Sequence, residues 1–249
     1  MTITTQLLEL KMYINGEWRL SSNPDTNKVI NPANGELIAI APRATVEETK
    51  EAIKAAKETF ESGVWSNLSA QERADYLLKI ADKIDENHDE LVELEVKDNG
   101  KIKAEADIDI SDAASCFRYY AGLIRTPDGQ TYHVADPMQA MVVREPVGVT
   151  GLIVPWNFPF LMSVWKFAPA LAAGNTIVYK PAEVTPVTAT KLVEIIEEIG
   201  VPKGVVNLVL GKGSVIGEVI AASHDVDMVS FTGSTEVGRS IMRNAAGNL

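Results

Sequence analysis

A regular alternation of short β-prone runs and longer helical patterns, which begins at Val147, constrains the fold more than any other feature. The β-prone runs are rich in branched residues and cover 147–154, 175–179, 205–210 and 227–231. The helical patterns lie near 160–173, 185–199, 214–223 and 235–246. Strands and helices spaced in this way imply right-handed crossovers and a parallel sheet with helices on both faces. We therefore predict a doubly wound parallel α/β core over 148–249.

Residues 1–126 combine a tight hairpin with a helical stretch. An Asn-Gly pair, Asn15-Gly16, lies between apolar and aromatic residues, which is a strong hairpin signal. From Thr45 to 125 the apolar spacing becomes that of one helix face. Two Ser/Thr-x-x-Glu pairs fit capping boxes: Thr45 with Glu48, and Ser69 with Glu72. We expect 45–125 to be mostly helical.

Between these parts, 127–147 reads as an extended segment. Turn residues open it at Thr126-Pro127-Asp128-Gly129, and the β-prone run Gln139–Glu145 is closed by Pro146. Such a run is either an ordinary edge strand or a strand that pairs with another subunit. Unpaired strand edges invite partners, so we predict an oligomerisation-type strand and a homo-oligomer.

Composition narrows the classes of partner. The 23 basic and 34 acidic side chains give a net charge of -11, which disfavours nucleic acid and membrane surfaces. Many carboxylates, Asp98, Asp109 and Asp112 among them, fall in the helical stretch without calcium-loop spacing, so we expect solvated helix faces. The scattered histidines suggest no metal site. A single cysteine, Cys116, without a secretion signal favours the cytoplasm.

The residues that follow the four β-prone runs are the candidates for a site. Ligands of open parallel sheets bind beyond the carboxyl ends of the strands. These positions hold Pro155-Trp156-Asn157-Phe158-Pro159, Lys180-Pro181-Ala182-Glu183, Gly211-Lys212-Gly213-Ser214 and Thr232-Gly233-Ser234-Thr235. We expect all four groups to line one rim.

Two of these groups suit a dinucleotide. Gly233-Ser234 leads into a helical pattern, so free backbone N–H groups and the helix dipole would favour an anion such as a pyrophosphate. A plain helix cap is the alternative. The glycines from Gly211 to Gly217 are spaced one residue wider than the GxGxxG pattern of dinucleotide sites. Lys180 and Glu183 suit ribose hydroxyls, or they form a surface ion pair. The carboxylate would repel a ribose phosphate, so we expect NAD rather than NADP.

The amide of Asn157 is a candidate oxyanion donor. Pro155 and Pro159 restrict the backbone around it, and aromatic side chains surround it in the sequence. A hydrogen-bond donor in such a water-poor site stabilises developing negative charge. Asparagine also serves structurally in turns, so this role stays open from the residues alone.

Together and in this order, these motifs resemble the aldehyde dehydrogenase superfamily: Pro-Trp-Asn-Phe-Pro, Lys-Pro-Ala-Glu, Gly-Lys-Gly-Ser and Phe-Thr-Gly-Ser-Thr-Glu-Val-Gly. The likeness extends over essentially the whole chain and implies a Rossmann-like fold. It also implies that NAD is surrounded by Ile153, Val154, Pro155, Trp156, Asn157, Lys180, Ala182, Glu183, Gly213, Ser214, Gly217, Phe231, Thr232, Gly233, Ser234 and Val237.

The resemblance further implies that a cysteine thiolate attacks an aldehyde, hydride passes to NAD, and a glutamate activates water to release a carboxylic acid. Asn157 would be the oxyanion donor and Lys166 would assist proton relay, unless Lys166 simply extends from its helix to solvent. Phe158 and Trp165 would contact the substrate. Aromatic faces suit the quaternary ammonium of betaine aldehyde, which we favour, but also an apolar aldehyde.

The chain departs from the family pattern in one respect. Family members continue past Gly247-Asn248-Leu249 into a stretch with the glutamate and then a segment with the nucleophilic cysteine. We therefore expect both groups in a C-terminal half, and we give Cys116 no catalytic role because it reads as a small buried hydrophobe. The alternatives are a non-catalytic NAD-binding module and a structural or interaction protein of the same fold.

Overall fold

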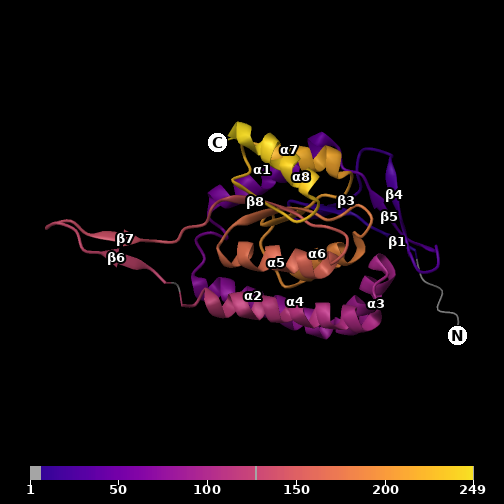
Figure 1. Ribbon diagram of the computed structural model, residues 1–249, viewed down its shortest axis with the longest axis horizontal. Coiled ribbons are helices and arrows are strands. Elements are labelled where there is room, and N and C mark those ends of the chain that lie inside the picture. The colour runs from indigo at the N-terminus through magenta and orange to yellow at the C-terminus, as the bar shows by residue number, and fades with distance from the viewer. Residues whose placement is uncertain (1–6, 127, 249) are drawn as a thin grey trace.

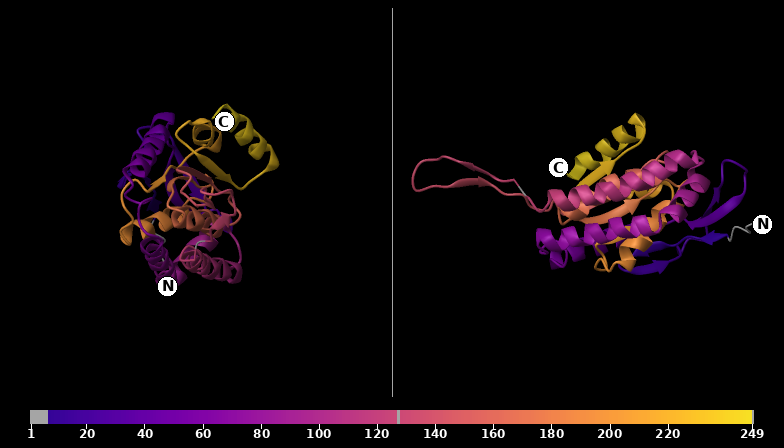
Figure 2. Two further views of the ribbon diagram at one scale, coloured as in Figure 1. Left: turned by 90° about the vertical axis from the view of Figure 1, so that its left-hand side faces the viewer. Right: turned by 90° about the horizontal axis from the view of Figure 1, so that it is seen from below.

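The computed structural model describes residues 7–126 and 128–248. The predicted extended segment begins at Pro127, which lies outside the described residues, as do residues 1–6 and Leu249 of the outer predicted parts. Figure 1 shows a central sheet between two layers of helices, with a thin two-stranded arm that projects from one end. In the two views of Figure 2 the arm again extends well beyond the body.

The central sheet has six strands in the order β11-β8-β9-β10-β2-β3. Its four parallel strands are β8 (Val149–Ile153), β9 (Thr176–Lys180), β10 (Val206–Leu208) and β11 (Met228–Phe231). The predicted N-terminal hairpin, β2 (Met12–Ile14) and β3 (Glu17–Arg19), extends this sheet, because Tyr13 pairs antiparallel with Leu208. The predicted α/β fold class is confirmed, with a parallel core.

Helices cover both faces of the sheet. One face carries α5 (Pro159–Ala172) and α6 (Val187–Glu198), and the other carries α1 (Val46–Ser62) and α7 (Glu218–Ala222). Packed against α7 is α8 (Thr235–Ala245). The remaining helices form an outer layer against α5: α2 (Ala70–Glu86), α3 (His88–Asn99) and α4 (Lys103–Leu123).

Local sequence signals account for several element ends. Both predicted capping boxes are present, since Thr45 accepts from the Glu48 N–H and Ser69 from the Glu72 N–H, and each glutamate bonds back to its cap backbone. In the β2–β3 turn, Asn15 and Gly16 have φ of 51° and 80°. Few residue types tolerate these left-handed conformations, which explains why Asn-Gly occupies this hairpin turn.

The structure adds elements that the sequence did not predict. A second sheet holds β1 (Leu8–Glu9), β5 (Leu37–Pro42) and β4 (Thr26–Ile30). The run around 139–145 is part of the arm, where β7 (Ala140–Val142) pairs antiparallel with β6 (Gln130–Tyr132) in the same chain. A single helix was expected over 214–223, but a π-helical turn, η1 (Gly213–Gly217), precedes α7. A 3-10 turn, η2 (Ala246–Asn248), follows α8.

The expectation that the helical carboxylates are all solvated is wrong for two of them. Asp98 and Asp109 are only 2% and 5% exposed. Asp98 accepts from the Val187 N–H at the start of α6, at 2.9 Å, and Asp109 pairs with Lys101. Each carboxylate therefore has a hydrogen-bonding partner that compensates in part for its lost hydration, a pairing that charge spacing alone does not reveal. Among the described helices, none is long and apolar enough to cross a membrane.

Candidate functional site

A crevice opens where the strand order of the central sheet reverses. From β8 the chain steps to β9 and β10, and it then returns to place β11 on the other side of β8. The loops that leave β8 and β11 therefore diverge to opposite faces, which is where open α/β sheets bind ligands. The crevice here has a volume of about 570 Å³.

The crevice collects residues from all four strand ends. From the predicted cofactor residues it contains Ile153, Val154, Pro155, Trp156, Lys180, Ala182, Gly213, Ser214, Gly217, Phe231, Thr232, Gly233, Ser234 and Val237. Asn157 and Glu183 lie outside this lining. The four motifs thus form one concave surface, with two of their polar side chains at its margins.

The N-terminus of α8 faces the crevice. Ser234 is its N-cap and accepts from the Val237 N–H at 3.3 Å, so the simple capping role is realised. Ser234, Glu236 and Val237 all line the crevice, which directs the positive end of the helix dipole toward it. The cap and an anion site are compatible, because capping by one side chain leaves other first-turn N–H groups free.

Glycines keep the opposite wall of the crevice open. A Cβ added to Gly213 would lie 3.4 Å from Cε of Lys180, and one at Gly217 would lie 3.9 Å from its Cδ. Both glycines belong to the π-helical turn η1, which runs directly beside the Lys180 stem. Side chains here would narrow the space around the lysine, so this backbone forms a smooth wall against which a flat ligand can lie.

Lys180 is a buried cation at the crevice. It is 4% exposed, and its Nζ donates to the Pro181 carbonyl at 2.6 Å. Burial lowers the pKa of Lys180 to about 8, although the charge of Glu183 opposes this shift. At neutral pH the ammonium is thus retained at a cost in hydration, and a ligand hydroxyl or anion would supply the missing partner.

The Glu183 carboxylate is held by an arginine. Arg43 donates from Nε to Glu183 Oε1 at 2.7 Å and from Nη1 to Asp25 Oδ2 at 2.9 Å. The Arg43 hydrogen bond holds the pKa of Asp25 below its usual value. Glu183 lines a narrow recess next to the crevice, and Ala182 lines both. The ion-pair alternative raised from the sequence is therefore realised, with Arg43 as the partner instead of Lys180.

The turn that carries Asn157 is fixed on both sides of that residue. Asn99 Nδ2 donates to the Trp156 carbonyl at 2.7 Å, and Lys101 Nζ lies 4.4 Å from the centre of the Phe158 ring. Asn157 itself is exposed. The corner between α3 and α4 thus contacts residues 156 and 158 and leaves the amide between them accessible.

Lys166 lies on α5 and contacts the edge strand β11. Its Nζ donates to Ser230 Oγ at 3.0 Å. Burial lowers its pKa, since the side chain is partly enclosed between α5 and the sheet. The structure therefore gives this lysine a specific polar partner, so it does more than extend along its helix to solvent.

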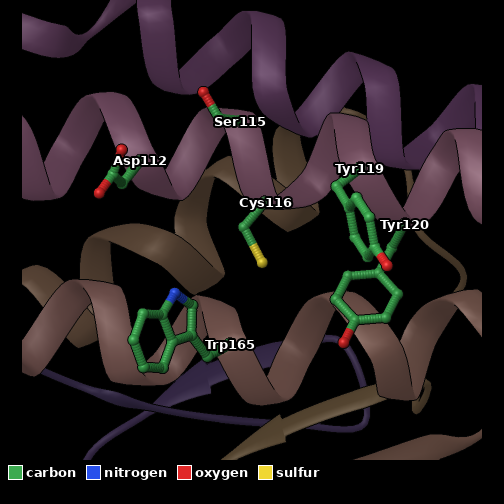
Figure 3. Close-up of a pocket in the computed structure, with 6 residues that line it drawn as sticks. All are labelled: Asp112, Ser115, Cys116, Tyr119, Tyr120 and Trp165. Carbon is green, nitrogen blue, oxygen red and sulfur yellow. The ribbon is translucent and has the colours of Figure 1, made fainter.

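Trp165 lies in a second cavity, of about 560 Å³, between α4 and α5. Figure 3 shows it facing the α4 side chains Asp112, Ser115, Cys116, Tyr119 and Tyr120. The Cys116 sulfur points toward α5, and burial raises its pKa to about 11, which disfavours a reactive thiolate. Phe158, the other predicted substrate residue, is 40% exposed and is not part of this lining.

Several lining residues escaped the sequence reasoning. In the crevice these are Glu218, Glu236, Ser240, Ile241 and Asn244. The positions 237, 240, 241 and 244 follow the i, i+3, i+4, i+7 spacing of one helix face, so helix periodicity beyond the Gly-Ser cap would have identified most of them. Asp112, Tyr119 and Tyr120 gave no comparable signal, because their cavity depends on how α4 packs on α5.

Comparison with known proteins agrees with this geometry. Residues 18–249 match the aldehyde dehydrogenase family. The betaine aldehyde dehydrogenase of Bacillus subtilis is 47% identical over 239 residues, which are 96% of this chain and 49% of that protein. The chloroplastic betaine aldehyde dehydrogenase of Beta vulgaris is 42% identical over 95% of this chain and 49% of its own length.

Solved structures show the same likeness. The betaine aldehyde dehydrogenase of Staphylococcus aureus, crystallised in complex with NAD+, has a TM-score of 0.94 and 45% identity over 97% of this chain and 48% of its own. The chain thus spans about half the length of the relatives it matches. With the family match extending from residue 18 to 249, the chain belongs to the aldehyde dehydrogenase family.

Proposed function

We propose that the chain binds NAD in the crevice and serves as the cofactor-binding part of an NAD-dependent aldehyde dehydrogenase. The observation that carries this proposal is the convergence of four strand ends and the α8 N-terminus on one crevice of about 570 Å³. The relatives crystallised with NAD+ add support. The predicted cofactor residues remain part of the proposal, including Asn157 and Glu183 at the margins.

The residues present fit a dinucleotide. The first turn of α8 offers N–H groups to a pyrophosphate, the η1 glycines leave space where side chains would intrude, and Lys180 lacks an acidic hydrogen-bond partner among its described contacts. We propose that Ser234 and Trp156 lie at the pyrophosphate, and that Lys180 and Glu183 hold the adenosine ribose. NAD, when bound, accepts the hydride of the aldehyde oxidation.

We propose that Asn157 donates its amide N–H to the oxygen that becomes negatively charged when a thiolate attacks the aldehyde. The fixed flanks of its turn keep the donor in place before the reaction, which is what makes such a donor effective. Lys166, with its lowered pKa, would hold or pass a proton near Ser230. The enclosed Cys116 thiol is unsuited to be the nucleophile, so we assign the thiolate and the water-activating glutamate to residues outside this chain.

We propose betaine aldehyde as the substrate. The cavity beside Trp165 combines an indole, two tyrosine rings and the Asp112 carboxylate, which together suit a quaternary ammonium. An apolar aldehyde would gain nothing from the carboxylate. The names of several relatives point to the same substrate.

We further propose a cytoplasmic homo-oligomer, divided into 1–126, 127–147 and 148–249. The projecting arm supports the oligomer, because Met138, Met141 and Val143 are each more than 60% exposed on it. The lone thiol supports a reducing compartment.

Calorimetric titration of the purified 249-residue chain with NAD tests the central proposal. We expect saturable binding that Gly213→Val weakens at least about tenfold, because the added branches would crowd the Lys180 stem. The matched control is Gly122→Ala, where no atom lies within 4 Å of the added Cβ. If a folded wild-type chain gave no heat with NAD, both the enzyme and the NAD-binding-module readings would be abandoned.

A further inference from the structure

Arg43 holds a fixed position beside the margin of the crevice. It follows β5, and the N–H of its neighbour Ala44 donates to the Leu210 carbonyl at 2.7 Å, just past β10. A Cβ on Gly211 would lie 3.4 Å from the Arg43 Cα, so the two backbones pass in close contact. The arginine therefore starts from a backbone anchored to the central sheet.

The guanidinium is shared between two carboxylates. Nε donates to Glu183 and Nη1 to Asp25, and the Arg43 and Glu183 side chains are only 22% and 25% exposed. The backbone at Glu183 is fixed as well, because its carbonyl accepts from Asn27 Nδ2 at 2.6 Å. Partial enclosure and a planar two-pronged contact make this a more defined group than a fully exposed pair.

This ion group adjoins the crevice. Ala182, the neighbour of Glu183, lines both the crevice and the recess that contains the Glu183 side chain. On the other side of Ala182, the Pro181 carbonyl accepts from Lys180, which also lines the crevice. A carboxylate and an arginine therefore lie together where we place the adenosine ribose.

The two groups have opposite preferences for that ribose. A carboxylate accepts a hydrogen bond from a free 2′-hydroxyl and repels a 2′-phosphate, whereas a nearby arginine accommodates the phosphate. We propose that Arg43 determines the dinucleotide preference. Paired with Glu183 it holds the carboxylate for the 2′-hydroxyl of NAD, and released from Glu183 it becomes the cation that binds the 2′-phosphate of NADP. This inference rests on the proposed NAD site.

Calorimetric titration of four forms of the 249-residue chain with NAD and with NADP tests the inference: wild type, Glu183→Ala, Arg43→Gln and the double variant. We expect Glu183→Ala to tighten NADP binding about tenfold or more, since a charge-assisted contact to phosphate replaces repulsion. Adding Arg43→Gln to Glu183→Ala abolishes this gain. Arg43→Gln alone weakens NAD binding severalfold, because Glu183 is no longer held in place.

Two further variants keep the result interpretable. Arg125→Gln removes the same charge from a pair with Asp75 on the α2–α4 layer and leaves the affinities for NAD and NADP unchanged. Arg43→Lys, in the Glu183→Ala background, retains part of the gain, because lysine keeps the charge but loses the planar fork.

Each failure has its own signature. Equal NADP affinity of Glu183→Ala with and without Arg43→Gln overturns the role of Arg43 and leaves the NAD site standing. A folded wild-type chain that binds no NAD overturns the proposed function, and this inference with it. Thermal unfolding of each variant establishes that the chains compared are folded.

Discussion

Two buried lysines show how differently one charge is treated in two regions of the molecule. At the corner between α3 and α4, the Lys101 side chain is 6% exposed, pairs with Asp109, and lies 3.3 Å from Glu95 Oε1. At the crevice, Lys180 is 4% exposed but its ammonium donates only to a backbone carbonyl among the described contacts. Burial lowers the pKa of Lys180 to about 8.

The difference lies in what compensates for lost hydration. Lys101 is surrounded by two carboxylates and the face of Phe158, so removing it would leave buried negative charge without a partner. Lys180 lacks such neighbours, so its charged form is destabilised in the folded chain. The first lysine belongs to the architecture of the helical layer. The second retains unused binding capacity beside a cavity, which is typical of a ligand site.

The comparison predicts that Lys101→Met is strongly destabilising. We expect a loss of about 3–5 kcal/mol in the free energy of unfolding, the range found when one partner of a buried pair is removed. Urea denaturation followed by circular dichroism measures it. The control is Lys103→Met, an exposed lysine at the start of α4, with a change below about 0.5 kcal/mol. A similar small change for Lys101→Met would remove the distinction between the two lysines.

At Lys180 the expected effect is smaller and depends on pH. The folded pKa is about 8, whereas the unfolded value is near 10.5, so the unfolded chain binds more protons between these values. Stability from this group therefore rises as pH increases from 8 toward 10.5, by about 2–3 kcal/mol, and its cost is fully present below pH 8.

Lys180→Met should remove that dependence. We expect the variant to be more stable than wild type at pH 7, with the difference shrinking as the pH approaches 10. Denaturant midpoints at several pH values, read as the difference between the two chains, separate Lys180 from the other groups that titrate there. A difference that stays constant with pH would mean that Lys180 is not the buried uncompensated cation.

The smallest effect is expected in the cavity between α4 and α5. Trp165→Ala should weaken binding of tetramethylammonium about 2–30-fold, the range of cation–π contacts from exposed to desolvated sites. Asp112→Asn should weaken it by less than about fivefold, because the carboxylate is exposed. NMR titration monitors both. Trp18→Phe, on the hairpin far along the sheet, is the control, and unchanged affinity in Trp165→Ala would exclude this cavity as the ammonium site.

The crevice was more predictable from the sequence than this cavity, for a physical reason. Strand periodicity and crossover handedness bring the residues after β8, β9, β10 and β11 to one edge, so the lining follows from topology alone. Asp112 and Trp165 meet only because α4 packs on α5 in one particular rotation. Nothing in either helical pattern specifies that rotation.

The sequence also did not reveal how charges pair. Glu183 was recognised as a ribose ligand, but its partner Arg43 is 140 positions earlier, in a sheet whose strands were not predicted. Asp98 and Asp109 were taken for solvated carboxylates because charge runs on helices usually are. Lys101 and the start of α6 reach them only in the folded chain.

The hairpin at the start of the chain has a consequence for how the protein is made. Tyr13 pairs with Leu208, the Asn15 N–H donates to Asn207, and Trp18 donates to Glu197, so the first strands find their places only after β10 has been synthesised. Contacts that span so much sequence are slow to form. On the ribosome these early apolar residues must therefore wait, unpaired and open to chaperones, until the polypeptide is more than four-fifths complete.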